Sequence, residues 1–343
     1  DAYREYLRGV EQVLESFNAS AGAELQRAAY EHFERARSID PGFADAHLRA
    51  ANYWTVELSP TRTDTGSSGQ TAQQSLREYH DRIDQAIDTA KTEADQLRIL
   101  ADRAVLDLQL REARRLYEQY LEIRPNDDMA WSQLGQVLRW LSEDAVFMAQ
   151  QERWAARGET DRFAANNYVS GSYTVVDPAE AADVSLKLLQ RWPNSSGMVY
   201  QVHRTLLWAG RFAEASGLAA RYNTLEPGGH PLVAAREACA AGDRATAEKI
   251  LEQLENAEDA NISRLWILHN MLGNTARETE VLRPLEQSGV PYQLASFLTY
   301  HKFDPRPFPT LMAILEREGV ERPEPAVPPF RCPPNTLQVE SGK

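Results

Sequence analysis

Three prolines recur at one regular interval along this chain. Pro125 and Pro193 stand two periods apart, and Pro193 and Pro227 stand one period apart, where the period is about 34 residues. Because proline disfavours helix in the residue before it, each proline closes a helical segment. Pro41 fits the same register if the polar, Ser/Thr/Gly-rich stretch near 59–74 is an insertion. The spacing predicts helical units of constant length that meet at these prolines.

The residues around each proline alternate between small and large apolar side chains at helical spacing. Apolar positions recur three and four residues apart, and strand-like alternation is almost absent. Small residues such as Ala113 and Gly135 let two helix axes approach to about 8–10 Å. Large residues such as Tyr117 and Trp131 fill the space between successive helices. The pattern predicts an all-α chain whose helix pairs stack, since one pair cannot bury its apolar face alone.

A period of about 34 residues in helix pairs is typical of tetratricopeptide repeats, which the segment 23–228 resembles. The clearest copy is the segment MAWSQLGQVL, which follows Pro125. The resemblance implies an α-solenoid, a right-handed superhelix of tandem helix hairpins. We expect the array over 1–228, degenerate repeats or capping helices over 229–320, and a Pro-rich tail over 321–343.

The layout and the two ends of the chain also resemble the tetratricopeptide region of bacterial multidomain regulators. In those proteins the repeats are fused to an adenylate cyclase, a kinase or a winged-helix domain. The first residue, Asp1, suggests a fragment of a longer chain. The compartment stays open: it is cytoplasmic, or extracytoplasmic if a transmembrane segment precedes this region.

The Pro-rich tail and the two cysteines each leave two alternatives. Six prolines between Pro323 and Pro334 exclude a helix there. This segment is either disordered or docked on the array with Phe330 and Cys332 as anchors, and we favour the docked form. Cys332 and Cys239 match no zinc or redox spacing. A disulfide between them is one alternative, and two unrelated thiols are the favoured one.

Charge and motif content argue against several function classes. The net charge is -13, so the average field repels a phosphate backbone, and we expect no nucleic-acid partner. Glycine-rich phosphate loops, nucleophile elbows and paired metal-binding histidines are absent from the sequence, so we expect no enzyme, no cofactor and no metal site. No apolar run is long enough to cross a bilayer, so we expect no direct membrane insertion.

In tetratricopeptide proteins the first helix of each unit lines a concave groove. Carried over by register, the resemblance implies that nine residues form a peptide-binding groove here: Arg98, Arg139, Trp140, Asn166, Asn167, Tyr173, Tyr200, Arg204 and Trp208. Asparagine amides bind peptide backbone, arginines pair with carboxylates, and aromatic rings are flat anchors. The alternative for the aromatic residues is packing between helices, which we favour for Trp140 and Trp208.

The expected function is therefore a protein- or peptide-binding scaffold or sensor module of a larger bacterial regulatory protein. One alternative is a self-association or spacer element, such as a homodimer, for a fused enzyme. A remote alternative is an enzyme on a helical toroid, against which the register of the prolines argues. Binding of a chaperone tail is disfavoured, because Asp102 occupies a position where that subtype requires asparagine.

Overall fold

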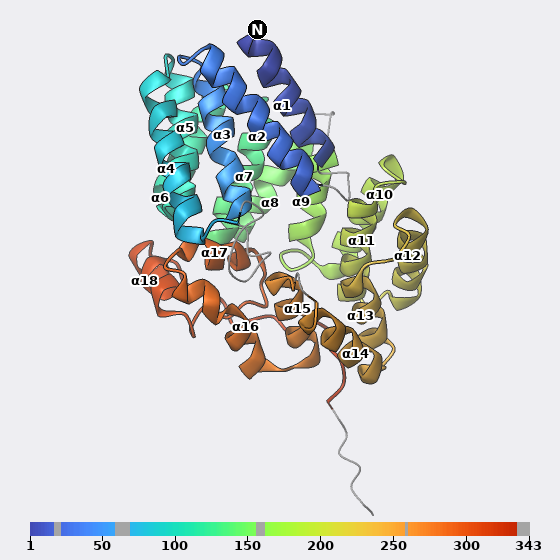
Figure 1. Cartoon of the computed structure of the whole chain (residues 1–343). Helices are drawn as coiled ribbons and strands as arrows, with labels where there is room; N and C mark the ends of the chain where they lie inside the picture. Colours follow the sequence, from blue (N-terminus) through green and yellow to red (C-terminus); the bar gives the residue numbers. More distant parts are fainter. Residues whose placement is uncertain (17–21, 59–68, 156–161, 258–259, 335–343) are drawn as a thin grey trace, which may run out of the picture. The chain divides into compact units, whose positions relative to one another are not determined.

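The computed structural model describes most of the chain as helix (Figure 1). The described residues are 1–16, 22–58, 69–155, 162–257 and 260–334. Within these ranges the chain forms eighteen α-helices, one 3-10 helix and no strand. The expected all-α class is confirmed. The chain divides into two compact units, unit 1 and unit 2.

Unit 1 comprises residues 1–154 together with 285–299 and 308–322, which return from the C-terminal part of the chain. Its main helices are α1 (Ala2–Ser16), α2 (Gly22–Ile39), α3 (Ala44–Glu57), α4 (Ala72–Thr89), α5 (Glu93–Leu106), α6 (Leu110–Ile123), α7 (Asp128–Trp140) and α8 (Asp144–Ala155). The returning segments supply α17 (Pro291–Ala295), the 3-10 helix η1 (Ser296–Thr299) and α18 (Pro309–Arg317).

Unit 2 comprises residues 155–284, 300–307 and 323–343. Its helices are α9 (Arg162–Ser172), α10 (Pro178–Arg191), α11 (Ser196–Trp208), α12 (Phe212–Leu225), α13 (Pro231–Ala240), α14 (Arg244–Glu255) and α15 (Ile262–Leu272). The next helix, α16 (Thr275–Gln287), contains Pro284, where the division between the units falls.

Consecutive helices pack against each other within each unit (Figure 1). The contacting pairs include α1 with α2, α3 with α4 and α5 with α6 in unit 1, and α11 with α12 and α13 with α14 in unit 2. Alternate helices also touch: α3 contacts α5, and α9, α11, α13 and α15 contact one another in sequence. The odd-numbered helices of unit 2 therefore lie side by side.

The four prolines of the predicted register occupy equivalent corners. Pro41, Pro125, Pro193 and Pro227 each stand two residues after the end of a helix. The residue after the last helical one leaves the helical conformation at three of these corners, with φ of -125° at Arg124, -129° at Trp192 and -123° at Glu226. Proline disfavours the helical conformation in the residue that precedes it, which explains why these helices stop at the same point.

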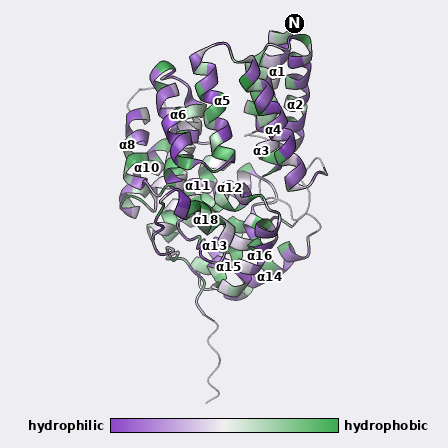
Figure 2. Ribbon diagram, turned by 90° about the vertical axis from the view of Figure 1, so that its left-hand side faces the viewer, coloured by the Kyte–Doolittle hydropathy of each residue, from purple (hydrophilic) through white to green (hydrophobic). Residues whose placement is uncertain are grey.

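Glycines on one helix make room for large side chains of the next helix, so that the two helices pack closely. A Cβ atom placed on Gly135 of α7 would lie 3.2 Å from the Phe147 ring of α8. A Cβ atom on Gly9 of α1 would lie 2.6 Å from the Phe33 ring of α2. Figure 2 shows hydrophobic residues and hydrophilic residues on the same helices, as amphipathic packing requires. These contacts bury the apolar faces of paired helices.

The expected insertion near 59–74 lies partly outside the described residues. Residues 59–68 are not described, and residues 72–74 belong to α4. Thr71 caps this helix, because its hydroxyl accepts from the Gln74 backbone N–H while the Gln74 side chain accepts from the Thr71 N–H. Among the described helices, none combines the length and apolar character needed to cross a bilayer.

The Pro-rich segment docks on unit 2 as far as Pro334, and residues 335–343 lie outside the described part. Cys332 forms a disulfide with Cys239, and its backbone N–H donates to the Met271 carbonyl at 2.9 Å. The Phe330 ring meets the Trp208 ring edge-on, with 6.1 Å between centroids. The expectation of two unrelated thiols is wrong, because docking joins cysteines that stand 93 residues apart in the sequence.

Candidate binding site

The nine predicted groove residues fall in both units. Arg98, Arg139 and Trp140 belong to unit 1. Tyr173, Tyr200, Arg204 and Trp208 belong to unit 2. The side chains of Asn166 and Asn167, on α9, lie outside the described residues.

The three residues of unit 1 are engaged by neighbours in their own unit. Arg98 is 8% exposed and donates to Asp102 and Asp127, each at 3.1 Å. Arg139 donates through Nη2 to the carbonyl of Thr299. Trp140 is fully buried, so it has no surface to offer a ligand. In unit 1 the side chains predicted to bind a peptide are therefore engaged in internal packing, hydrogen bonds and ion pairs.

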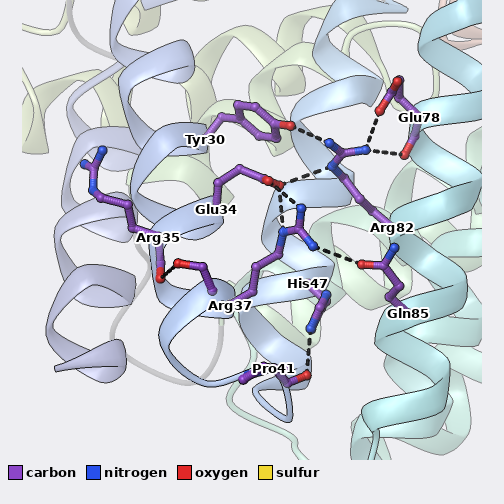
Figure 3. Close-up of polar contacts among 10 residues, drawn as sticks. Tyr30, Glu34, Arg35, Arg37, Pro41, His47, Glu78, Arg82 and Gln85 are labelled. Atoms are coloured by element: carbon purple, nitrogen blue, oxygen red, sulfur yellow. Dashed lines mark hydrogen bonds and ion pairs between the residues drawn. The ribbon is translucent and has the colours of Figure 1, made fainter.

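A second polar cluster in unit 1 joins α2 to α4 (Figure 3). Glu34 accepts from Arg37 at 2.5 Å and from Arg82 at 3.2 Å, and Arg82 also donates to Glu78 at 2.5 Å and to the Tyr30 hydroxyl at 2.7 Å. Burial by itself would raise the pKa of Glu34, but the two guanidinium groups outweigh it and lower the pKa. Two arginines balance two glutamates here, so the cluster holds α2 against α4 and leaves no excess charge for a ligand.

Unit 2 contains a small pocket whose basic side chains are not balanced by acidic ones, and we call it the cationic pocket. It is lined by Tyr173, Arg204, Trp208, Arg236, Ile267, Met271, Tyr300, Lys302 and Phe330. The cavity has a volume of about 10 Å³ for the centre of a water molecule to occupy, which is about the space that one bound water needs. The pocket therefore has room for one small group rather than a whole ligand of drug size.

The three cations of the pocket rest on aromatic faces. The Arg204 guanidinium carbon lies 4.5 Å from the Tyr173 ring centroid, and the Arg236 guanidinium carbon lies 4.5 Å from that of Tyr200. The Lys302 Nζ lies 5.1 Å from the Trp266 centroid. Such cation–π contacts contribute about 0.5–2 kcal/mol each.

No carboxylate of the described residues lies within 4.0 Å of the nitrogen atoms of these three cations. Burial and the neighbouring Arg236 and Arg204 hold the pKa of Lys302 well below its usual range, and only Glu278 opposes them. Burial in turn raises the pKa of Glu278. The pocket therefore concentrates positive charge without a matching anion, in a chain whose net charge is negative.

The repeat spacing positions two of the cations. Arg204 on α11 donates from Nη2 to the Ser170 carbonyl on α9 at 3.1 Å, across 34 residues of sequence. Arg236 on α13 donates from Nη2 to the Tyr200 hydroxyl on α11 at 2.8 Å, across 36 residues. Each arginine thus reaches back to the preceding odd-numbered helix, since these helices lie side by side.

Six of the nine lining residues were not predicted from the sequence, among them Arg236, Lys302 and Phe330. Arg236 lies where the unit length has drifted, since Gly242 follows Gly210 by slightly less than one period, so the transferred register does not select it. Lys302 and Phe330 arrive from segments distant in sequence and carry no helical register at all. The sequence indicates Phe330 as an anchor of the Pro-rich segment, but not as a residue of a binding site.

Comparison with known proteins does not add to this picture. No protein-family model matches the chain, and no curated protein is significantly similar to it in sequence. In the described residues, no three His, Cys, Asp or Glu side chains are grouped in a way that would hold a metal ion.

Proposed function

We propose that this chain is a helical-repeat scaffold of the tetratricopeptide type, and that unit 2 binds a polypeptide partner along its odd-numbered helices. Two observations support the repeat assignment. The prolines that stand one or two periods apart occupy equivalent corners, and α9, α11, α13 and α15 contact one another in sequence. A stack of this kind presents a continuous row of first helices, which is where repeat scaffolds bind extended peptides.

The observation that carries the binding proposal is the convergence of predicted groove residues on the cationic pocket. Tyr173, Arg204 and Trp208 line the pocket, and Tyr200 holds Arg236 in place there. Tyr200 and Trp208 are partly exposed. Partly exposed aromatic rings beside arginines are the composition of interface hot spots.

The disulfide supports placing this region in an oxidising compartment. Cys239 and Cys332 are both buried, and their bond ties the Pro-rich segment to α13. Structural disulfides persist outside the reducing cytosol. We therefore propose a sensor or interaction module exposed to an extracytoplasmic space, consistent with the resemblance to repeat regions of bacterial regulators.

The test is a peptide selection with the whole chain as bait. Random peptides are displayed and selected on the folded protein, and the best binder is then titrated against three proteins: wild type and two variants. Arg204→Ala should weaken binding by about tenfold or more. Lys249→Ala is the matched control, because Lys249 is exposed on the even-numbered helix α14 and should leave affinity unchanged.

Circular dichroism and thermal melting of each variant separate lost binding from lost folding. Failure to select any peptide above the background of an unrelated helical protein would contradict the proposal. Equal affinity of Arg204→Ala and wild type would contradict the placement of the site in unit 2. Sedimentation of the free protein tests the self-association alternative, for which a dimer that blocks peptide binding is the diagnostic result.

A further inference from the structure

The Arg236 side chain has a buried hydrogen-bond donor without an acceptor. The residue is 2% exposed, and its Nη2 donates to the Tyr200 hydroxyl. Its Nη1 is buried and has no partner among the described residues. A charged donor that is removed from water and left unpaired is costly, so proteins normally provide an acceptor.

The cation–π contact does not provide that acceptor. Stacking uses the face of the guanidinium group, whereas its N–H bonds lie in the plane and point to the sides. Arg204 has an unused donor as well. Its guanidinium group stacks on Tyr173, while its Nε is buried without a partner among the described residues. The buried Arg236 and the partly exposed Arg204 thus each keep a buried, unused donor nitrogen at the same pocket, which Lys302 also lines.

We propose that the cationic pocket binds a single carboxylate group, with Arg236 Nη1 as its buried donor, Arg204 as the second positive charge and Lys302 as a further hydrogen-bond donor. The space of about 10 Å³ is close to that of one water molecule, so it admits an oxygen atom of a carboxylate and excludes a nucleotide or a phosphosugar. Ile267, Met271 and Phe330 form apolar walls that suit the short alkyl chain attached to a carboxylate.

Two sources present the same chemistry. The carboxylate is either an acidic side chain of the bound polypeptide, in which case the inference rests on the proposed function, or a free small organic acid. A free acid would make the pocket the receptor of a sensor. The binding group is the same in both cases, so the first experiment uses acetate alone.

Acetate is titrated into the whole chain at constant ionic strength, and the arginine side-chain Nε–H resonances are followed by NMR. We expect a saturable shift of the Arg236 resonance, and no such shift with acetamide, which has the same shape without the charge. Arg236→Met keeps an unbranched side chain over Tyr200 and removes the donors. It should weaken acetate binding by at least about tenfold, which is about 1.4 kcal/mol.

A second variant and a control keep the outcome interpretable. Lys302→Met, whose loss of binding is followed on the Arg236 resonance, serves if Arg236→Met fails to fold. Arg211→Met is the control, because Arg211 is paired with Asp183 and Glu214 away from the pocket lining and should bind acetate as wild type does. A linear, unsaturated response to acetate, or an equal response to acetamide, would overturn the inference.

Competition separates the two sources and keeps this inference distinct from the proposed function. If an acidic side chain of a selected peptide occupies the pocket, acetate displaces that peptide. If the pocket serves a free acid, acetate and peptide bind together. Saturable acetate binding without any selectable peptide upholds the carboxylate site and rejects the peptide scaffold. A selectable peptide without saturable acetate binding upholds the peptide scaffold and rejects the carboxylate site.

Discussion

Tyr200 contacts Arg236 in two ways: its ring lies under the guanidinium group at 4.5 Å, and its hydroxyl accepts from Nη2 at 2.8 Å. The pair joins α11 to α13 and fixes a buried cation without a carboxylate. Both contacts use the same tyrosine, and Nη1 of the guanidinium group remains without an acceptor among the described residues. This relationship distinguishes unit 2 from unit 1, where Arg98 is neutralised by two aspartates.

Tyr200→Phe should destabilise the protein although it keeps the ring. The hydroxyl is lost, so a second buried N–H of Arg236 has no acceptor, at a cost of about 1–3 kcal/mol. The measurement is the free energy of unfolding from urea denaturation. Tyr222→Phe is the matched control, because the neighbouring Tyr222 makes ring contacts with Tyr200 and His230 but no hydrogen bond among the described residues. Equal losses in both variants would show that the hydroxyl does not support Arg236.

Gly9→Ala should lower stability, whereas Gly217→Ala should raise it. Both glycines are helical, so alanine brings the same intrinsic gain of about 0.5–1 kcal/mol. At Gly9 the new Cβ atom would meet the Phe33 ring at 2.6 Å, and overpacking costs about 1–3 kcal/mol. Around Gly217 there is open space within 4 Å. Thermal melts of the two variants check the opposite signs, and a gain at both sites would contradict the tight contact of α1 with α2.

Arg98→Met should be strongly destabilising, because it leaves Asp102 buried beside the Tyr117 hydroxyl without its cation. Breaking a buried ion pair costs about 3–5 kcal/mol. Adding Asp102→Leu to Arg98→Met should restore part of the loss, since the uncompensated charge is then gone. Arg103→Met breaks a more exposed pair with Asp84 and should cost less than about 1 kcal/mol. If the double variant loses as much unfolding free energy as Arg98→Met and Asp102→Leu lose together as single variants, the result would argue against the ion pair.

Stability should fall as the pH is lowered from 6.5 towards 4, with His230 as one contributor. Burial, followed by the nearby Arg264 and Arg236, lowers the pKa of His230 from 6.5 to about 4. On acidification the unfolded chain binds the proton first, so stability is lost between these two values and is fully present above the higher one. The contribution is about 1–3 kcal/mol after allowance for its partial exposure.

His230→Asn isolates this contribution. His230 caps α13 by accepting from the Leu232 N–H at 3.1 Å, and asparagine is also a good capping residue that does not titrate. The variant should show a flatter loss of unfolding free energy between pH 6.5 and 4 than wild type. His203 and His269, whose pKa values burial also lowers, remain in both proteins and cancel in the difference. Identical pH profiles would contradict a His230 that stays neutral in the folded protein between pH 6.5 and 4.

Cys332→Ser should lower the free energy of unfolding by about 2–4 kcal/mol under oxidising conditions, because the disulfide closes a long loop. It should also impair the cationic pocket, since Phe330 is held against Trp208 by the same segment. Under dithiothreitol the variant and wild type should converge in stability and in acetate binding. A persistent difference under reduction would mean that the serine, rather than the lost bond, causes the effect.

The sequence predicted what depends on local spacing and missed what depends on returning segments. The prolines stop helices through the residue before them, so their corners follow from the sequence alone. The register puts Trp140 and Trp208 in the groove, while packing between helices is the favoured alternative for both, and the structure gives them different surroundings. Tyr292, from a segment that returns to unit 1, packs edge-on against the fully buried Trp140 at 5.9 Å, whereas Trp208 stays partly exposed beside Phe330. No local pattern encodes which helix a distant segment will contact.

The most direct test combines one change in the partner with one change in the protein. A selected peptide is compared with its Glu-to-Gln version by calorimetric titration against wild type and Arg236→Met. We predict that the glutamate contributes about tenfold or more in affinity to wild type and almost nothing to Arg236→Met, because the two charges meet in the cationic pocket. An equal loss from the glutamine peptide in both proteins would contradict the account.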